Sequence, residues 1–379
     1  MTVGTTGRGG TGISILGTAQ HAAWQDRTLP PVERLSGGVW SVPVPIPDNP
    51  LRYTLCYLIA GDRGLVVVDP GWGTDEGWEA LLAGLGTAGA AVSDVTGIVA
   101  THVHPDHHGL SGRLREHSGA WIAMHPAERD TLPQRTALTH PGARREFLRR
   151  GLRRWGAPEE HIKDLLRPFG ERSADRFVFT MAEPDVLLED GDTVPLPGRR
   201  LRAVWTPGHT PGHLCLQEPD AGLLLTGDHV LPRITPNIGL NRVNGDAPLT
   251  RFLESLERTA AFDDHDALPA HEYRFRGLAA RTRQLRDHHE QRCRELVTVI
   301  AGLGSPTVWQ VAEQLSWSRP WAEVGQMRIG ALSETEAHIR HLADRGELDF
   351  PDSHPADLPG TSSDDVPEVR VRLASHAVH

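Results

Sequence analysis

Residues 37–277 alternate short apolar runs with segments of helical periodicity. The runs 65–68 (LVVV) and 97–101 (GIVAT) are apolar at nearly every position and end at turn-forming residues, which predicts buried strands. Strands that alternate with helices predict an α/β domain of two sheets with helices outside them. The expected strands are 37–45, 53–60, 65–68, 97–101, 120–124, 177–181, 185–189, 202–205, 213–218, 223–226 and 267–270, and the expected helices between them are 78–85, 110–117 and 249–259.

The sequence pattern differs in the segments outside these strands. Residues 126–176 are polar and helical in pattern, which predicts a helical insertion over the functional site. From residue 278 the strands stop, and a pattern of three helices and a short strand is typical of a winged helix, although many small helical caps share it. We therefore expect a flexible leader at 1–35, a main domain at 36–277, a winged-helix-like domain at 278–350 with helices at 278–303, 307–315 and 330–345, and a disordered tail at 351–379.

Length, charge and cysteine content exclude several classes of protein. The 379 residues carry 39 Lys and Arg against 49 Asp and Glu, a net charge of −10 that disfavours a nucleic-acid partner. No apolar run reaches the roughly 20 residues of a membrane-spanning helix, and the first residues lack the layout of a secretion signal. The three cysteines form no CxxC pair. We therefore expect a cytoplasmic protein without a membrane partner, and a homodimer stays open.

Histidines dominate the candidate chemistry. Residues 101–109 read THVHPDHHG and directly follow the predicted strand 97–101. Residues two apart in an extended chain point the same way, so His102 and His104 can converge on one ion, while Asp106 and His107 can reach a second ion beside it. Imidazole and carboxylate ligands without a thiolate suit zinc, and also iron or manganese.

Three later segments carry further candidate ligands, each after a predicted strand. Residues 206–213 (TPGHTPGH) place His209 in a tight turn, residues 226–229 (TGDH) present Asp228, and residues 269–271 (PAH) end on His271. Every candidate ligand therefore follows the carboxyl end of a strand, where α/β folds place their sites.

These segments resemble the HxHxDH, GHTxGH, GD and final-His elements of the metallo-β-lactamase superfamily, in the same order, over residues 37–277. The resemblance implies a four-layer αββα sandwich that binds two Zn²⁺ ions, with Fe or Mn as alternatives. It implies His102, His104 and His209 on one ion, Asp106, His107 and His271 on the other, and Asp228 between both. Asp69 and His213 match positions that support the ligands without binding metal.

The resemblance also implies an activity. It predicts a dinuclear hydrolase in which a metal-bridging hydroxide attacks a carbonyl and Asp106 passes a proton to the leaving group. Residues 285–348 resemble the winged-helix extension of the branch that contains lactamase-β-like proteins and polyketide thioesterases. This favours a thioester, ester or lactone, either as a small molecule or on CoA or a carrier protein.

Other activities stay open. One alternative is a phosphodiesterase or endoribonuclease of the same fold, but residues 278–350 carry 9 basic against 10 acidic residues, which disfavours RNA binding. The other is a mono-iron enzyme similar to persulfide dioxygenases, or a non-catalytic binding protein.

Three residues are candidates for binding substrate. Arg149 and Arg153 lie in an arginine-rich helical stretch, and their guanidinium groups could bind the phosphate of CoA or phosphopantetheine. A solvated helix face explains the same pattern. Trp72, just after Asp-Pro-Gly, could line a pocket, although most tryptophans belong to a core.

Overall fold

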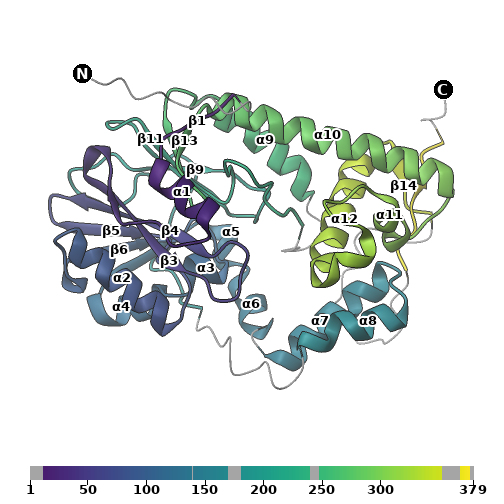
Figure 1. The fold of residues 1–379 in the computed structure, drawn as a ribbon, viewed down its shortest axis with the longest axis horizontal. Coiled ribbons are helices and arrows are strands. Elements are labelled where there is room, and N and C mark those ends of the chain that lie inside the picture. Colours follow the sequence, from purple (N-terminus) through teal and green to yellow (C-terminus); the bar gives the residue numbers. More distant parts are fainter. Residues whose placement is uncertain (1–11, 139, 170–180, 240–246, 352–367, 376–379) are drawn as a thin grey trace. The chain divides into compact units, whose positions relative to one another are not determined.

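A computed structural model of the chain describes residues 12–138, 140–169, 181–239, 247–351 and 368–375. The chain divides into two compact units (Figure 1). The first contains Met1–Leu132, Phe179–Pro236 and Glu254–Leu285, and the second contains Pro133–Val178, Asn237–Leu253 and Arg286–His379.

The first unit contains a seven-stranded sheet in the order β2-β3-β4-β5-β6-β7-β8. Strands β2 to β5 pair antiparallel, whereas β5 to β8 pair parallel, so the carboxyl ends of β5, β6 and β7 meet at one edge. The strands are β2 Glu33–Arg34, β3 Val39–Pro45, β4 Tyr53–Gly61, β5 Gly64–Val68, β6 Val95–Val99, β7 Trp121–Met124 and β8 Val186–Leu187.

The same unit contains a six-stranded sheet in the order β1-β13-β12-β11-β10-β9. Only β11 and β12 pair parallel here, so their carboxyl ends also lie at one edge. The strands are β1 Ser14–Ile15, β9 Arg202–Trp205, β10 Leu214–Glu218, β11 Leu223–Gly227, β12 Asp266–Pro269 and β13 Phe275–Arg276.

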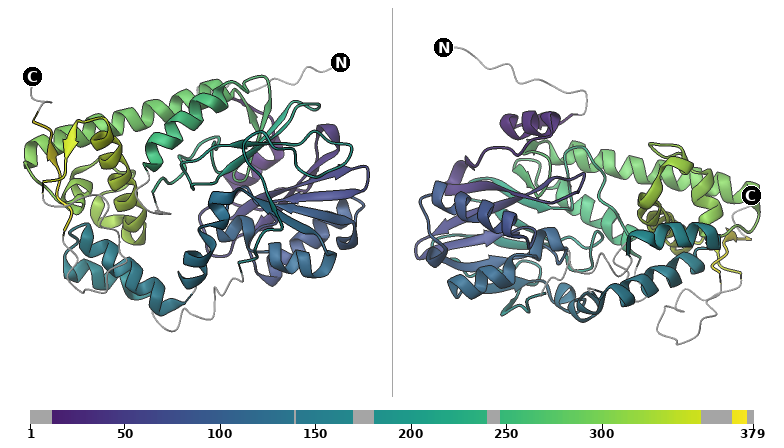
Figure 2. Two further views of the ribbon diagram at one scale, coloured as in Figure 1. Left: turned by 180° about the vertical axis from the view of Figure 1, so that it is seen from behind. Right: turned by 60° about the horizontal axis from the view of Figure 1, so that its bottom comes forward.

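The two sheets pack face to face through one buried core. Val66 and Val68 of β5 share this core with Leu225 of β11 and Leu268 of β12. Val67 points to the opposite face, because side chains alternate along a strand, and packs in the core that includes helices α2 Asp75–Thr87 and α4 Ser111–Ser118. These helices cover the outer face of the first sheet (Figures 1 and 2). The structure confirms the expected layered α/β sandwich.

The second unit is mostly helical. Its core joins Leu152 of α7, and Trp155 directly after this helix, with Ile300 of α10 and Leu342 of α12. The Trp155 indole donates a 2.7 Å hydrogen bond to Glu336. Helices from the expected insertion thus share a core with the carboxyl-terminal helices. The elements that lie wholly or mostly in this unit are α6 Leu132–Leu138, α7 Pro141–Arg154, α8 Glu159–Leu166, α10 Leu278–Leu303, α11 Val308–Gln314, α12 Arg328–Asp344, β14 Leu348–Asp349 and β15 Arg372–Leu373.

The described residues near both ends of the chain form secondary structure, which differs from the expected flexible leader and disordered tail. Residues 12–35, predicted as a flexible leader, contain β1, α1 Thr18–Asp26 and β2, and the buried Gln20 donates to the Ser41 hydroxyl. Residues 368–375, predicted as part of a disordered tail, contain β15, which pairs with β14 and is preceded by the buried Val371. Both predictions are wrong at these residues, because composition does not show which distant strand a short segment can pair with.

Two further expectations concern residues 177–181 and the carboxyl-terminal helices. The strand predicted at 177–181 lies outside the described residues except for Met181. The three carboxyl-terminal helices are observed as α10, α11 and α12, while their assignment to a winged helix stays a prediction. Among the described residues, no helix combines the length and apolar character required to span a bilayer.

Candidate metal centre

The predicted ligands gather where the strands of the two sheets end. His102 and His104 follow β6, His209 follows β9, and Asp228 and His271 come directly or shortly after β11 and β12. Asp106 and His107 lie on the short helix α3 Pro105–His108. The carboxyl ends of the strands thus bring together residues that are far apart in the sequence.

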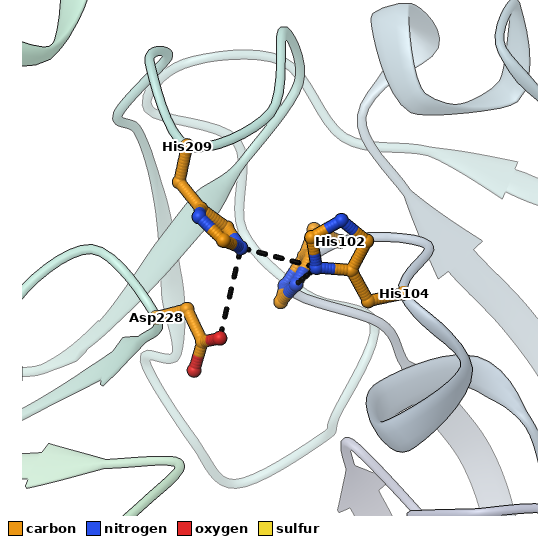
Figure 3. Close-up of side chains that lie close together, drawn as sticks. All are labelled: His102, His104, His209 and Asp228. Atoms are coloured by element: carbon orange, nitrogen blue, oxygen red, sulfur yellow. Dashed lines mark hydrogen bonds and ion pairs between the residues drawn. The ribbon is translucent and has the colours of Figure 1, made fainter. Parts of the chain in front are cut away.

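The first group of ligands consists of three histidines and one carboxylate (Figure 3). The Nδ1 atom of His104 lies 2.8 Å from Nε2 of His102 and 3.1 Å from Nε2 of His209. Nε2 of His209 lies 3.6 Å from Oδ2 of Asp228. The four side chains therefore point their ligand atoms at one small volume.

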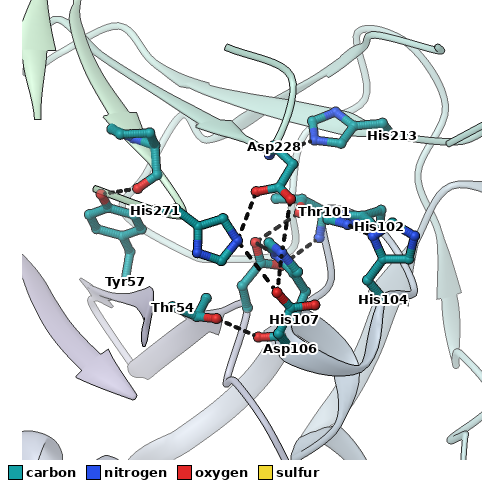
Figure 4. A network of polar contacts seen from close by, with 12 residues as sticks. Thr54, Tyr57, Thr101, His102, His104, Asp106, His107, His213, Asp228 and His271 are labelled. Carbon is teal, nitrogen blue, oxygen red and sulfur yellow. Dashed lines mark hydrogen bonds and ion pairs between the residues drawn. The ribbon is translucent and has the colours of Figure 1, made fainter. Parts of the chain in front are cut away.

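The second group consists of Asp106, His107 and His271 (Figure 4). Oδ2 of Asp106 lies 3.7 Å from Nε2 of His107 and 3.4 Å from Nε2 of His271. Asp228 reaches this group as well, since its Oδ2 lies 3.5 Å from His107 and its Oδ1 lies 3.2 Å from His271. One carboxylate thus faces both groups.

The geometry of both groups fits metal binding. Ligand atoms bound about 2.0–2.2 Å from one tetrahedral ion lie about 3.4 Å from each other, close to the separations observed. Nε2 of His107, Nε2 of His271 and Oδ1 of Asp228 are buried without a hydrogen-bond partner in the described structure. Buried polar atoms of this kind need a partner, and a cation satisfies all three.

Asp69 orients two of the histidines. Its carboxylate accepts hydrogen bonds from the Thr101 amide and hydroxyl, each 2.8 Å long, and from Nδ1 of His107 at 2.9 Å. Because the Thr101 hydroxyl proton is used in this way, Nδ1 of His102 must be the donor to the Thr101 oxygen, 3.1 Å away. Both histidines consequently carry a proton on Nδ1 and turn Nε2 toward the centre, the orientation of a histidine that binds metal.

Asp69 also has an unusual backbone. Its φ of 52° lies in the left-handed region, which few residues other than glycine adopt. Asp is among the residues that tolerate this region, and such conformations cluster at functional sites where the surrounding contacts hold them.

His213 positions Asp228 from outside both groups. Its Nε2 accepts a 3.1 Å hydrogen bond from the Asp228 amide, and its Nδ1 lies 2.8 Å from the Thr206 hydroxyl. The close approach requires Gly227, since a Cβ there would lie 2.6 Å from the His213 ring and 2.9 Å from the Thr101 hydroxyl. The glycine of the GD element therefore makes room for the histidine that holds its aspartate.

Strand β4 fixes the second group from the first sheet. The Tyr53 carbonyl accepts a 2.8 Å hydrogen bond from Nδ1 of His271, and the Thr54 hydroxyl donates one of the same length to the Asp106 carbonyl. The Tyr57 hydroxyl donates to the Pro269 carbonyl, two residues before His271 (Figure 4). Strand β4 thus holds the His271 ring and the backbone of Asp106.

The charges of the centre shift pKa values in opposite directions. Burial raises the pKa of Asp106, but the adjacent His107 and His271 outweigh it and lower the value to about 2. Burial lowers the pKa of His271, but Asp228 and Asp106 outweigh it and raise the value to about 10. Burial and neighbouring imidazoles hold the pKa of His102 well below its usual range. The carboxylates therefore attract a positive charge. When a metal ion binds His271, it displaces the proton on that ring, and the proton passes to solvent.

The sequence did not indicate Glu128, which joins the two loops that carry the three histidines of the first group. This fully buried residue lies on α5 Pro126–Arg129. Its carboxylate accepts a 2.9 Å hydrogen bond from the amide of Val103, between two ligands, and a 2.7 Å bond from the amide of Gly212. These partners lie 25 and 84 residues away, so no local pattern reveals them.

We expect Glu128→Gln to weaken metal binding about tenfold, the lower end of the range for residues that support ligands. Both partners are N–H donors, so the amide group of glutamine must place its own donor against one of them. Competition with a chelator measures the affinity, and the exposed Glu116→Gln on α4 is the matched control. Equal affinities in both variants would contradict this role.

The remaining candidate residues lie elsewhere. Trp72 is half-buried in a loop whose Gly71 is hydrogen-bonded to His107 and Leu110 at 3.4 and 3.0 Å, so this loop adjoins α3. Arg149 and Arg153 lie on α7 in the second unit and form ion pairs with Glu146 and Glu159, at 2.7 and 2.8 Å. Their side chains are 35% and 31% exposed, so the ion pairs remain open to exchange with a ligand.

Known proteins share both sequence and structure with this chain. The lactamase-like protein adaB of Aspergillus niger is 25% identical over 312 residues, which cover 81% of this chain and 74% of that protein. The acyl-coenzyme A thioesterase MBLAC2 of Homo sapiens is 31% identical over 179 residues, which cover 46% of this chain and 57% of that protein.

Two solved structures extend the similarity over most of the chain. A metallo-beta-lactamase family protein from Thermus thermophilus is 30% identical with a TM-score of 0.68, covering 89% of this chain and 98% of that one. A beta-lactamase domain protein from Burkholderia ambifaria is 25% identical with a TM-score of 0.67, covering 90% and 95%. The model of the metallo-beta-lactamase superfamily matches residues 49–271, more than half of the chain and all seven side chains of the two groups, so this protein belongs to that superfamily.

Proposed function

We propose that this protein is a dinuclear metal-dependent hydrolase that cleaves a thioester, ester or lactone, with acyl thioesters of CoA or a carrier protein as the foremost substrates. The position of Asp228 carries the proposal, because one carboxylate faces two groups of ligands at 3.2–3.6 Å. A carboxylate shared in this way can bind two adjacent ions through its two oxygens. The similarity to a protein named as an acyl-coenzyme A thioesterase supports the substrate class.

The bound ions, which we propose to be zinc, would supply a nucleophile at neutral pH and polarise the carbonyl under attack. The protein's own residues do the rest. Asp106 has a pKa lowered to about 2, so its carboxylate is ionised at neutral pH and can accept a proton. We assign it the transfer of that proton to the leaving group. Thr54, bonded to its carbonyl, and His271, beside its Oδ2, hold it in place.

Metal analysis combined with a panel of substrates tests the proposal. The panel contains an acyl-CoA, a short thioester without the nucleotide, a lactone and a short single-stranded RNA. At least two metal ions per chain with turnover of the thioesters or the lactone is the expected result. Cleavage of RNA alone would assign the protein to the nucleases, and one iron without hydrolysis would overturn the proposal.

Phosphate recognition by Arg149 and Arg153 is a separate part of the proposal. Each guanidinium forms a charge-assisted hydrogen bond worth about 1.5–3 kcal/mol, so we expect alanine at either position to raise KM for an acyl-CoA about tenfold. KM for the short thioester without phosphate should not change. Arg167→Ala, an exposed position of the same unit, is the control. Equal effects on both substrates would assign the two arginines a purely structural role.

A further inference from the structure

A further cluster of potential ligands lies in the second unit, on helices α10 and α12. His288 and His289 of α10 and Glu334 of α12 each offer one ligand atom, and these atoms lie within 4.8 Å of one another. His288 is exposed, Glu334 is partly buried and His289 is fully buried. The cluster contains none of the ligands of the centre described above.

A chain of hydrogen bonds determines which nitrogen of His289 is available. Nδ1 of His338 lies 2.7 Å from the Glu334 carbonyl, which can only accept, so this nitrogen carries the proton. Burial lowers the pKa of His338 to about 3, so the ring is neutral and its Nε2 is an acceptor. Nδ1 of His289, 3.0 Å from that Nε2, must therefore be the donor.

The proton on Nδ1 leaves a lone pair on Nε2 of His289. Burial also holds the pKa of this histidine well below its usual range, so Nε2 is not protonated. The atom is buried and has no hydrogen-bond partner in the described part of the chain. A histidine that binds metal through one nitrogen typically donates the other N–H to a fixed acceptor, and His289 is held in that state.

Among the described residues, no arginine, lysine or histidine forms an ion pair with the Glu334 carboxylate. Burial raises the pKa of its carboxyl group, while Arg292 lowers it. Arg292, however, already pairs with Glu295 at 2.8 Å, bonds the Ser316 carbonyl and stacks on Trp317. A cation between α10 and α12 would neutralise the Glu334 carboxylate and would also be bound by the lone pair on Nε2 of His289.

We propose that His288, His289 and Glu334 bind a divalent transition-metal ion of the zinc type, with solvent completing the shell. Two imidazoles and one carboxylate suit such ions better than Mg²⁺ or Ca²⁺, which prefer oxygen ligands alone. The exposed His288 gives the ion access from solvent. The ion would connect two helices that both contribute to the core of the second unit, so its binding stabilises that unit.

The test uses the full chain, stripped with a chelator and titrated with Zn²⁺. His288→Ala and Glu334→Gln alter the more accessible ligands and spare the buried His289, and Glu313→Gln, exposed on α11, is the control. Each ligand variant should bind about one Zn²⁺ per chain fewer than wild type. Zn²⁺ should also raise the Tm of each ligand variant by less than it raises the Tm of the control.

The Asp228→Ala background separates this site from the hydrolytic centre. In that background about one Zn²⁺ per chain should remain, and adding Glu334→Gln should remove it. The result holds whether or not the protein hydrolyses any substrate. Identical Zn²⁺ binding with and without Glu334→Gln, or no Zn²⁺ left in the Asp228→Ala protein, would overturn the proposal.

Discussion

Asp228→Ala is expected to reduce hydrolysis about a thousandfold, the upper range for removal of one electrostatic group from an active site. Its carboxylate lies 3.6 Å from His209 in the first group and 3.2 Å from His271 in the second. Removal leaves each ion with one ligand fewer and leaves Asp106 as the one carboxylate among the remaining ligands. We therefore expect both ions to bind more weakly, which metal analysis after dialysis measures.

A matched substitution shows whether the effect is specific. Asp220→Ala removes an exposed aspartate of the same unit, which pairs with Arg200 at the surface. This variant should retain wild-type metal content and turnover, because surface ion pairs contribute little. Full metal content in Asp228→Ala would refute the proposed sharing of this carboxylate.

Asp69→Asn is expected to lower metal affinity by about 10–100-fold without unfolding the protein. Asparagine keeps the size of the side chain and tolerates the positive φ of 52°. Its amide, however, brings a donor to a position where the Thr101 amide, the Thr101 hydroxyl and Nδ1 of His107 all donate. His107 can relieve the conflict by moving its proton to Nε2, which is the nitrogen that faces the centre.

Zn²⁺ affinity and thermal unfolding together measure this effect. Asp75→Asn, which removes a surface ion pair with Arg113 in the same unit, is the control and should match wild type in both. If the His107 proton moves to Nε2, the free energy of Zn²⁺ binding should fall by more than the free energy of unfolding. A variant that loses stability but binds Zn²⁺ normally would show that Asp69 only holds the loop.

The fold of the first unit was predictable because its signals are local. The apolar run at β5 and the turns around it show a buried strand, and Val66 and Val67 alternate between two cores as a period of two requires. The expected strand 202–205 matches β9, and the expected helix 278–303 matches α10. At the termini, by contrast, Gly- and Pro-rich composition was a poor guide, because β1 and β15 are only two residues long and each depends on a partner strand outside its own segment.

The seven potential ligands could be predicted because each one follows a strand end within a distinctive motif. The residues that hold them were only partly predictable. Asp69 and His213 match known positions of the motif, whereas Glu128 stands in a segment whose sequence shows nothing of its two distant amide partners. The same limit applies to His289, which looks like an ordinary helical histidine until α12 places His338 beside it.

The sequence by itself determined the layered α/β architecture and the identity of the residues that can bind metal, because hydrophobic periodicity and motif spacing are properties of the chain alone. Tertiary structure decided how those residues act. For His107 and His271, the position of the ring proton depends on an acceptor from another segment, namely Asp69 for His107 and the Tyr53 carbonyl for His271. Hydrogen bonds of this kind join residues far apart in the chain, and folding alone brings donor and acceptor within about 3 Å of each other.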